Sequence, residues 1–257
     1  MTGAYHAVTP PQGTITTRST GSFDQTGESL REQREFVVSR GDFQIRLAST
    51  DKGQRSHVSM LIQRMYAWRG LLTQAPTQLD THANQVTLIA SRGATVFGTV
   101  SLGLDSGEKL AADTLYGEEL DQLRQQNARI CEMTRLAIDP AFNSKEVLGS
   151  IFHLAYIFSR LIHCMTDLVI EVNPRHAPFY RKMLGFTVIG SERTCPRVNA
   201  PAVLLHLPLS YADDQIRRHG GGIQDNGRTL YSQFLSEHEQ AGLLRRIQSD
   251  PLFGGTH

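Results

Sequence analysis

Two different periods of hydrophobic and polar residues run along the chain and define its expected elements. Phe43–Leu47 alternates residue by residue, which is typical of a strand with one buried face. Apolar residues then recur every three or four positions, which predicts a helix that is capped by Thr50 or Asp51 and ends near Arg69. The apolar face of this helix comprises Val58, Leu61, Ile62, Met65 and Trp68.

The next stretch favours a hairpin, a crossing helix and a longer strand. Gln85–Ala90 and Thr95–Leu102 read as strands, and the Arg-Gly pair within Ser91–Ala94 is typical of a hairpin turn. Thr114–Gln126 is amphipathic and mostly polar, so we expect a helix that crosses the sheet. Ala128–Ile138 alternates again and predicts a strand.

A long apolar helix, a buried strand and a short helix follow. Ser144–Met165 carries an apolar stripe at helical spacing, and its histidine and arginine side chains argue against a membrane span. Asp167–Val172 is continuously apolar, as in strands that are buried on both faces. Pro174 suits the start of a helix and Gly185 suits its C-terminal cap.

Two further strands complete the expected sheet. Phe186–Ile189 and Ala202–Leu207 read as strands around a loop at Arg193–Pro201. The order of elements predicts an α/β (α+β) domain over residues 41–210, built on a mixed, mostly antiparallel sheet flanked by helices.

The two ends of the chain are expected to be extensions of this domain. Residues 1–24 are rich in Thr, Ser, Gly and Pro, so residues 1–40 are expected to form a partly disordered arm with a short helix at Ser29–Val38. Residues 211–257 predict a helical C-terminal extension. Within it, Arg217–Gly222 reads as a hinge and Arg228–Ile247 as one charged amphipathic helix.

Composition narrows the classes of function. A formal net charge of +1 argues against nucleic-acid binding, which normally goes with a strong basic excess. The three cysteines have neither CxxC nor metal-ligand spacing, so we expect reduced thiols and no metal site. The N-terminus lacks the apolar core of a signal peptide, and a cytoplasmic location is therefore expected.

Two motifs resemble the GNAT superfamily of N-acyltransferases. The run Glu132–Ile138 is similar to the signature of acyl-homoserine lactone synthases, which are related enzymes. Glu171–Tyr180 followed by Met183–Phe186 is similar to long-chain N-acyl amino acid synthases of the N-acyltyrosine synthase type. The resemblance covers about residues 40–208. It implies a GNAT-like fold and transfer of a medium or long fatty acyl chain to the α-amino group of an amino acid.

The loop Asn143–Gly149 departs from the family pattern that grips the pyrophosphate of coenzyme A. That pattern uses glycine backbone N–H groups at a helix start. Here Glu146 occupies the first glycine position, and its carboxylate opposes a pyrophosphate. We therefore expect the donor to be an acyl-phosphopantetheine thioester on an acyl carrier protein rather than acyl-CoA, with no bound cofactor.

By the same resemblance, aminolysis of a thioester gives roles to residues of this unit. Glu132 is the candidate base, Tyr180 the candidate acid for the leaving thiolate, and His176 a base or carboxylate ligand. Backbone N–H groups are expected to bind the thioester oxygen where two neighbouring strands splay apart. These groups belong to Leu136, Ala137 and Ile138.

Arg135, Asn173 and Arg175 are expected to bind substrate. Strict alternation places Glu132 on the same strand face as Thr134, Leu136 and Ile138, unless a bulge intervenes. The alternatives are structural: an ion-pair network for Glu132 and Arg135, a solvent-facing His176, and a Tyr180 ring packed under the sheet.

A basic patch is the expected docking surface for an acidic carrier protein. Its residues are Lys145, Arg160, Arg181 and Lys182. A scattered, solvated surface is the alternative. Rival functions are an acyl-homoserine lactone synthase that uses S-adenosylmethionine, a non-catalytic acyl- or carrier-binding module, and a short-chain acetyltransferase.

Overall fold

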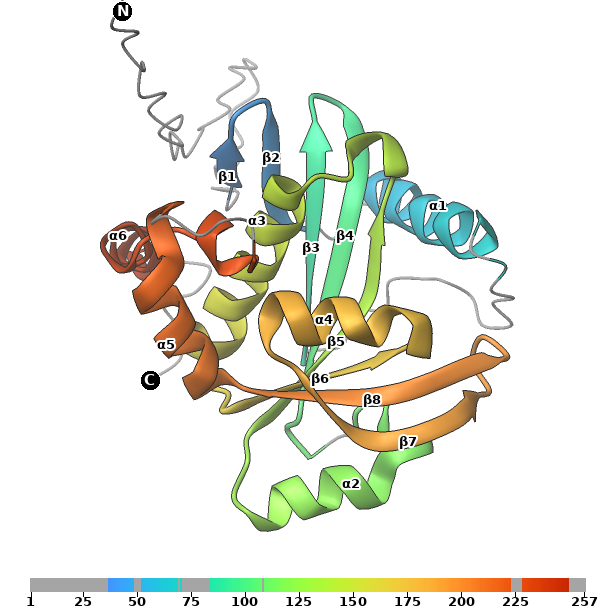
Figure 1. The fold of residues 1–257 in the computed structure, drawn as a ribbon. Helices are drawn as coiled ribbons and strands as arrows, with labels where there is room; N and C mark the ends of the chain where they lie inside the picture. The colour runs from blue at the N-terminus through green and yellow to red at the C-terminus, as the bar shows by residue number, and fades with distance from the viewer. Residues whose placement is uncertain are drawn as a thin grey trace, which may run out of the picture.

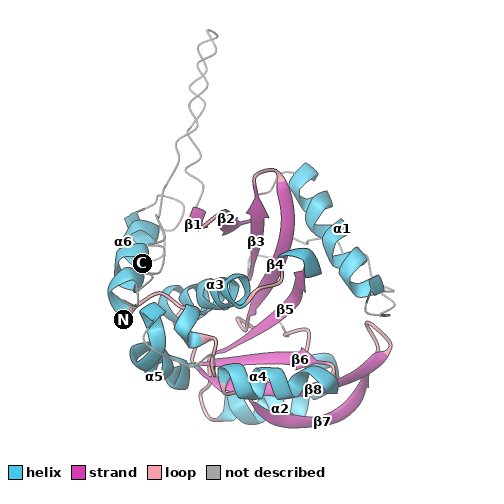
Figure 2. Cartoon of the chain, turned by 45° about the horizontal axis from the view of Figure 1, so that its top comes forward, coloured by secondary structure: helices cyan, strands magenta, loops and turns pink. Residues whose placement is uncertain are grey.

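A strongly twisted sheet forms the centre of the molecule, with helices on both faces (Figures 1 and 2). The computed structural model describes residues 37–48, 52–68, 70, 84–107, 109–222 and 228–249. The eight strands lie in the order β1-β2-β3-β4-β5-β6-β8-β7. Every neighbouring pair is antiparallel except β5 and β6, which are parallel.

The strands are β1 Val37–Arg40, β2 Phe43–Leu47, β3 Gln85–Arg92, β4 Thr95–Leu104, β5 Ile130–Ile138, β6 Asp167–Val172, β7 Thr187–Cys195 and β8 Ala200–Pro208. The α-helices are α1 Lys52–Trp68, α2 Asp113–Gln125, α3 Lys145–Tyr156, α4 Ala177–Leu184, α5 Leu209–His219 and α6 Glu237–Ser249. This confirms the mixed, mostly antiparallel sheet flanked by helices that the sequence predicts.

The helices divide the hydrophobic core by sheet face. α3, α4 and the C-terminal elements pack with one face in the main core. On the other face, α1 packs around Ile62 and α2 packs around Tyr116. No helix in the described part of the chain combines the length and the apolar composition needed to cross a membrane.

The predicted helix at Ser144–Met165 changes its geometry halfway. α3 gives way to wider π-helical turns at Ile157–Ile162. Ser159 Oγ donates to the backbone oxygens of Ala155 and Tyr156, and such contacts loosen the regular ladder of a helix.

The last two strands are longer than predicted, and the loop between them is correspondingly shorter. β7 continues to Cys195 through two register shifts, near Gly190 and before Arg193. Most of its residues are exposed or half-buried, so the strand has no hydrophobic alternation that the sequence could show.

The N-terminal part of the described chain is a strand rather than a helix. Val37–Arg40 pairs with β2, and Val38 is buried in the main core. The helix expected at Ser29–Val38 is therefore wrong at its last two residues, because the free edge of β2 supplies backbone partners. Its remaining residues, and the caps at Thr50 and Asp51, lie outside the described residues.

The C-terminal segment is part of the main core. α5 was not predicted, and the expected helix at Arg228–Ile247 is instead a 3₁₀ turn at Tyr231–Gln233 followed by α6. A capping box starts α6: the Ser236 N–H and hydroxyl both donate to Glu239 Oε2, at 2.8 and 2.7 Å.

Candidate active site

A β-bulge at Arg135 turns the side chains of β5. Arg135 has a φ of +52°, and it shares with Leu136 the space opposite a single β4 residue. The extra residue reverses the alternation beyond it, so that Leu136 and Ile138 face the main core and Ala137 faces α1. The expectation that Glu132 shares a face with Leu136 and Ile138 is therefore wrong.

β5 and β6 separate beyond the bulge, as expected for a substrate site between two parallel strands. Their last paired residues are Met133 and Ile170, and the strands then fan apart (Figure 1). Among the described residues, no strand pairs with the β6-facing edge of β5 after Met133. Backbone groups along this edge therefore have no partner strand that would occupy them.

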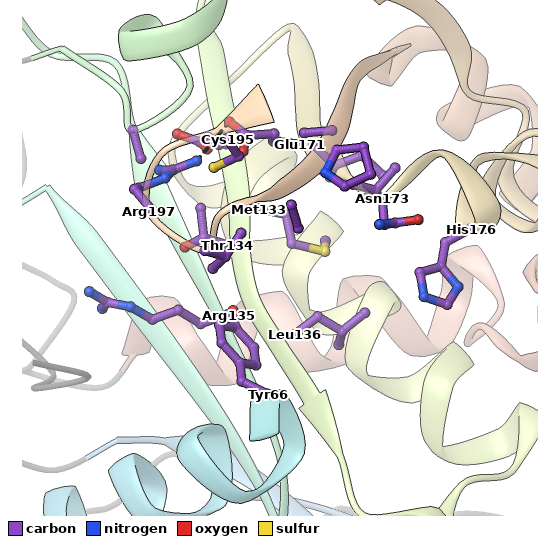
Figure 3. A pocket seen from close by; sticks show the side chains of 18 of the residues that line it. Tyr66, Met133, Thr134, Arg135, Leu136, Glu171, Asn173, His176, Cys195 and Arg197 are labelled. Atoms are coloured by element: carbon purple, nitrogen blue, oxygen red, sulfur yellow. Dashed lines mark hydrogen bonds and ion pairs between the residues drawn. The ribbon is translucent and has the colours of Figure 1, made fainter. Parts of the chain in front are cut away.

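A cavity of about 400 Å³ lies in this gap and reaches both faces of the sheet. On one face it is lined by Leu136 and Tyr180, which pack against the main core. On the other face it is lined by Ile62 of the α1 core. Figure 3 shows Arg197 and His176 at opposite ends of the pocket. Two substrates can therefore approach the same point from opposite sides of the sheet.

Glu132 is the buried carboxylate of this cavity, with 1% of its surface exposed. Its Oε2 accepts a hydrogen bond from the Ala112 N–H at 3.1 Å, and its Oε1 has no hydrogen-bond partner among the described residues. Burial raises the pKa of Glu132 to about 7, the Ala112 bond and Arg197 oppose this, and Glu171 adds to it. A carboxylate with a near-neutral pKa is suited to take up a proton at physiological pH.

A second group of polar side chains lies on the side of the cavity formed by β6 and the β7–β8 hairpin (Figure 3). Arg197 Nη2 donates to Glu171 Oε2 at 2.7 Å, and the Glu171 side chain is only 8% exposed. Cys195 is buried next to this pair, and burial followed by the contact with Glu171 raises the pKa of its thiol. Burial lowers the pKa of the Arg197 guanidinium, but Glu171, Cys195 and Glu132 together outweigh burial and raise it.

Sequence reasoning assigned no role to Glu171, Cys195 or Arg197. Glu171 and Arg197 are 26 positions apart and meet only when β8 folds back on β6. Glu171 lies within the motif Glu171–Tyr180, so its position carried a signal, whereas Arg197 lies in a turn without any periodic pattern.

The Asn173–His176 segment also lines the cavity, and it closes a tight turn. Asn173 Oδ1 accepts the Arg175 N–H at 3.2 Å and caps the 3₁₀ turn Pro174–His176. The exposed His176 lies at the cavity edge, where its Nε2 is 3.2 Å from Nε of Arg175. Asn173 thus has a clear structural function, while the predicted substrate roles of Arg175 and His176 stay predictions.

Tyr180 lines the cavity from α4 within an aromatic cluster. Its ring makes edge contacts with Phe152, Phe179 and Phe186, with centroid distances of 6.1, 5.5 and 6.0 Å. The ring therefore packs as the structural alternative expected, and it borders the cavity as the catalytic prediction requires.

The remaining predicted β5 residues separate into two groups. Arg135 lines the cavity and lies 3.5 Å from Gln85 Oε1 through Nη1, far from the Glu171 pair. Leu136 lines the cavity, whereas Ala137 and Ile138 are buried in the cores under α1 and α3.

The loop Asn143–Gly149 begins α3, with the Ser144 hydroxyl accepting the Val147 N–H at 3.1 Å. Gly149 lies against the C-terminal segment, where an added Cβ would be 2.4 Å from Cβ of Gln233. The glycine that survives in this loop therefore serves close packing with Gln233.

The predicted docking residues are spread over three helices. Lys145 is exposed at the start of α3, and Arg181 and Lys182 are exposed on α4. Arg160 is half-buried and forms an ion pair with Asp213 of α5 at 2.8 Å, which neutralises its charge within the chain. In the described part of the chain, no three His, Cys, Asp or Glu side chains cluster as metal ligands would.

Comparison with known proteins identifies the family. The family model for the N-acyl amino acid synthase FeeM matches residues 57–208, which is more than half of the chain. No curated protein sequence matches significantly. The structure of FeeM from uncultured soil microbes is 24% identical, with a TM-score of 0.60 over 65% of this chain and 92% of FeeM.

Two further solved structures are similar to this chain. The acyl-homoserine lactone synthase LasI is 14% identical, with a TM-score of 0.50 over 65% of this chain and 90% of LasI. A GNAT-family acetyltransferase from Streptococcus pneumoniae is 14% identical, with a TM-score of 0.46 over 65% and 99% of the two chains. Given its family match, the chain belongs to the FeeM family of N-acyl amino acid synthases and is an acyltransferase with a GNAT-like fold.

Proposed function

We propose that this enzyme moves a medium or long fatty acyl chain from an acyl carrier protein thioester to the α-amino group of an amino acid. The observation that carries the proposal is Glu132: a buried carboxylate with one unpartnered oxygen, in a cavity that opens to both faces of the sheet. The α3–α4 face serves the thioester arm, and the α1–α2 face serves the acceptor.

In the proposed reaction Glu132 acts as the general base. Its free Oε1 takes a proton from the acceptor ammonium, and the resulting amine attacks the thioester carbonyl carbon. The new C–N bond forms a tetrahedral intermediate, whose oxyanion binds to backbone N–H groups on the unpaired edge of β5 beyond Met133. The C–S bond then breaks, the nitrogen loses its second proton to solvent, and the thiolate receives a proton from Tyr180.

The start of α3 supports a carrier-protein donor. Glu146 is exposed in the first turn of α3, where its charge opposes an incoming pyrophosphate. Gly149, one turn further along, is covered by Gln233. A phosphopantetheine arm on a carrier protein needs no pyrophosphate site, so both features are compatible with that donor.

The exposed basic residues of α4 are the proposed docking surface. Arg181 and Lys182 follow Tyr180 directly, so a carrier protein bound to them lies next to the α3–α4 opening of the cavity. Lys145 is a further exposed basic residue, and Arg160 contributes little because Asp213 neutralises it.

Purified enzyme with matched acyl carrier protein and acyl-CoA thioesters tests the proposal. Mass spectrometry of the products with a mixture of amino acids identifies both the head group and the chain. We expect N-acyl amino acids and a higher kcat/KM with the carrier protein. Equal kcat/KM with both donors would contradict the donor assignment. Lactone formation with S-adenosylmethionine would contradict the acceptor assignment.

A further inference from the structure

The α1–α2 end of the cavity holds two carboxylates and one guanidinium that face the same space. Glu132 pairs in register with Val169, and Glu171 lies two residues further along β6, so both side chains point to one sheet face. Val169 packs with the α2 core, which identifies that face as the α1–α2 side.

Arg197 has donors left for a second anion. A guanidinium has five N–H donors in a rigid fork, and the ion pair with Glu171 engages Nη2. The Arg197 side chain is 38% exposed and lines the cavity, whereas its partner Glu171 is nearly covered. An acceptor bound here displaces water from the Arg197 guanidinium, which costs hydration free energy. An anionic group on the acceptor offsets this cost by accepting hydrogen bonds from the guanidinium.

The backbone around Arg197 fixes its position. It lies in the turn between β7 and β8, where Asn199 adopts a left-handed φ of +46° and Cys195 pairs with Ala200. The neighbouring Arg193 lies on the same hairpin but outside the cavity lining, where it pairs with Glu119 of α2 and stacks over Tyr116.

We infer that Glu132, Glu171 and Arg197 form the head-group subsite for a free α-amino acid. Arg197 binds the α-carboxylate, Glu171 holds Arg197 in place, and the unpartnered Oε1 of Glu132 accepts the ammonium. This inference deepens the proposed function and rests on it. It predicts that the enzyme selects free amino acids over amines, amino-acid amides and peptide N-termini, which lack the carboxylate.

The test compares a free amino acid with its own amide, using the best acceptor of the wild-type enzyme. The wild-type enzyme is expected to prefer the free acid by about 10- to 100-fold in kcat/KM, the typical effect of a charged hydrogen-bonded pair. Arg197→Met should remove most of that preference, mainly through KM for the acid, and Arg197→Lys should restore part of it.

Arg193→Met is the matched control, because it removes an arginine from the same hairpin without touching the cavity. It is expected to keep the wild-type preference for the free acid even if it lowers stability. The ratio of kcat/KM for the free acid to kcat/KM for the amide does not depend on the fraction of enzyme that is folded. An unchanged preference in Arg197→Met would overturn the subsite. No transfer to any amino acid by the wild-type enzyme would instead contradict the proposed function itself.

Discussion

The Ala112 N–H donates to Oε2 of Glu132 at 3.1 Å, whereas Oε1 of the same buried carboxylate has no hydrogen-bond partner among the described residues. The backbone thereby fixes one oxygen, and the other is the one that we propose takes up the proton. Figure 3 shows the surrounding pocket, in which β5 separates Arg197 from His176.

The first prediction concerns the pH dependence of the rate. Because burial raises the pKa of Glu132 to about 7, the fraction of ionised base falls below that pH. We expect kcat/KM to rise with pH through about 7 and then to level off. A pH–rate profile from pH 5.5 to 9 checks this, with acceptors of different amine pKa as the control. If the apparent pKa of the rising part of the profile shifts with the pKa of the acceptor amine, then the amine, and not Glu132, is being titrated.

The same carboxyl group makes a prediction about stability. A carboxyl whose folded pKa is raised from 4.5 to about 7 stabilises the fold fully only below pH 4.5, and this contribution is lost as pH rises to 7. Glu132→Gln removes the buried charge, so its free energy of unfolding relative to wild type should improve by up to about 3 kcal/mol between pH 5 and pH 8. Urea unfolding at the two pH values measures this difference. A constant difference would show that Glu132 titrates normally.

His153 connects the C-terminal segment to α3 and predicts acid sensitivity. Its Nδ1 accepts the Leu235 N–H at 3.1 Å, and its ring stacks on Phe234. Burial, with Arg40 adding to it, lowers the pKa of His153 to about 3. The stability that the neutral ring provides is present above about pH 6.5 and is lost as pH falls towards 3.

When the pH is lowered from 8 to 5, the free energy of unfolding of wild type should therefore fall by about 2 kcal/mol more than that of His153→Phe. Glu132 is present in both proteins, so its opposite effect on the pH dependence of stability cancels in this difference. His57→Phe, at an exposed position of α1, is the control and should follow wild type. An equal decrease in the free energy of unfolding of wild type and His153→Phe between pH 8 and pH 5 would rule out a buried neutral histidine.

Gly149 predicts a packing requirement that is separate from catalysis. Gly149→Ala places a Cβ 2.4 Å from Cβ of Gln233, and the C-terminal segment must shift to admit it. We expect a loss of about 1–3 kcal/mol in the free energy of unfolding. Adding Gln233→Gly should recover much of this loss. Gly117→Ala on α2 is the matched control, because nothing lies within 4 Å of its Cβ position. A destabilisation by Gly149→Ala no larger than that of Gly117→Ala would contradict the close contact.

Cys195 predicts direct transfer without a covalent acyl-enzyme. The thiol lines the cavity, but burial and Glu171 raise its pKa and keep it protonated, which makes it a poor nucleophile. Cys195→Ser should retain kcat within a few-fold, and intact-protein mass spectrometry of wild type with the donor alone should show no added acyl mass. An acylated protein that Cys195→Ser abolishes would require a two-step route.

Elements with a strong local period were predictable from the sequence. β2 and β6 have the expected bounds. A strand with one buried face alternates between apolar and polar residues, and a strand buried on both faces is continuously apolar, so both patterns can be recognised in a short segment. α5 was missed although Leu209, Ala212 and Ile216 recur at helical spacing and are buried. The Ser236–Glu239 capping box was likewise a readable signal that α6 begins near residue 237.

The parts of the site that were not predictable depend on backbone geometry or distant pairing. The left-handed Arg135 leaves no mark on residue type, yet it decides which β5 side chains meet the cavity. Glu132 was predictable because it lies in a motif. Its partner group, Glu171 and Arg197, forms through the pairing of β6 with β8 and through the turn after β7.

Single-turnover transfer from an acyl carrier protein to a free amino acid tests most directly whether Glu132 is the base for N-acylation. Glu132→Gln keeps the shape and loses the base, so its single-turnover rate at pH 8 should fall roughly 100-fold. Glu118→Gln, at an exposed position of α2, carries the same change in charge and should react like wild type. A folded Glu132→Gln protein that transfers the acyl chain at the wild-type rate would contradict the role of Glu132 as the base.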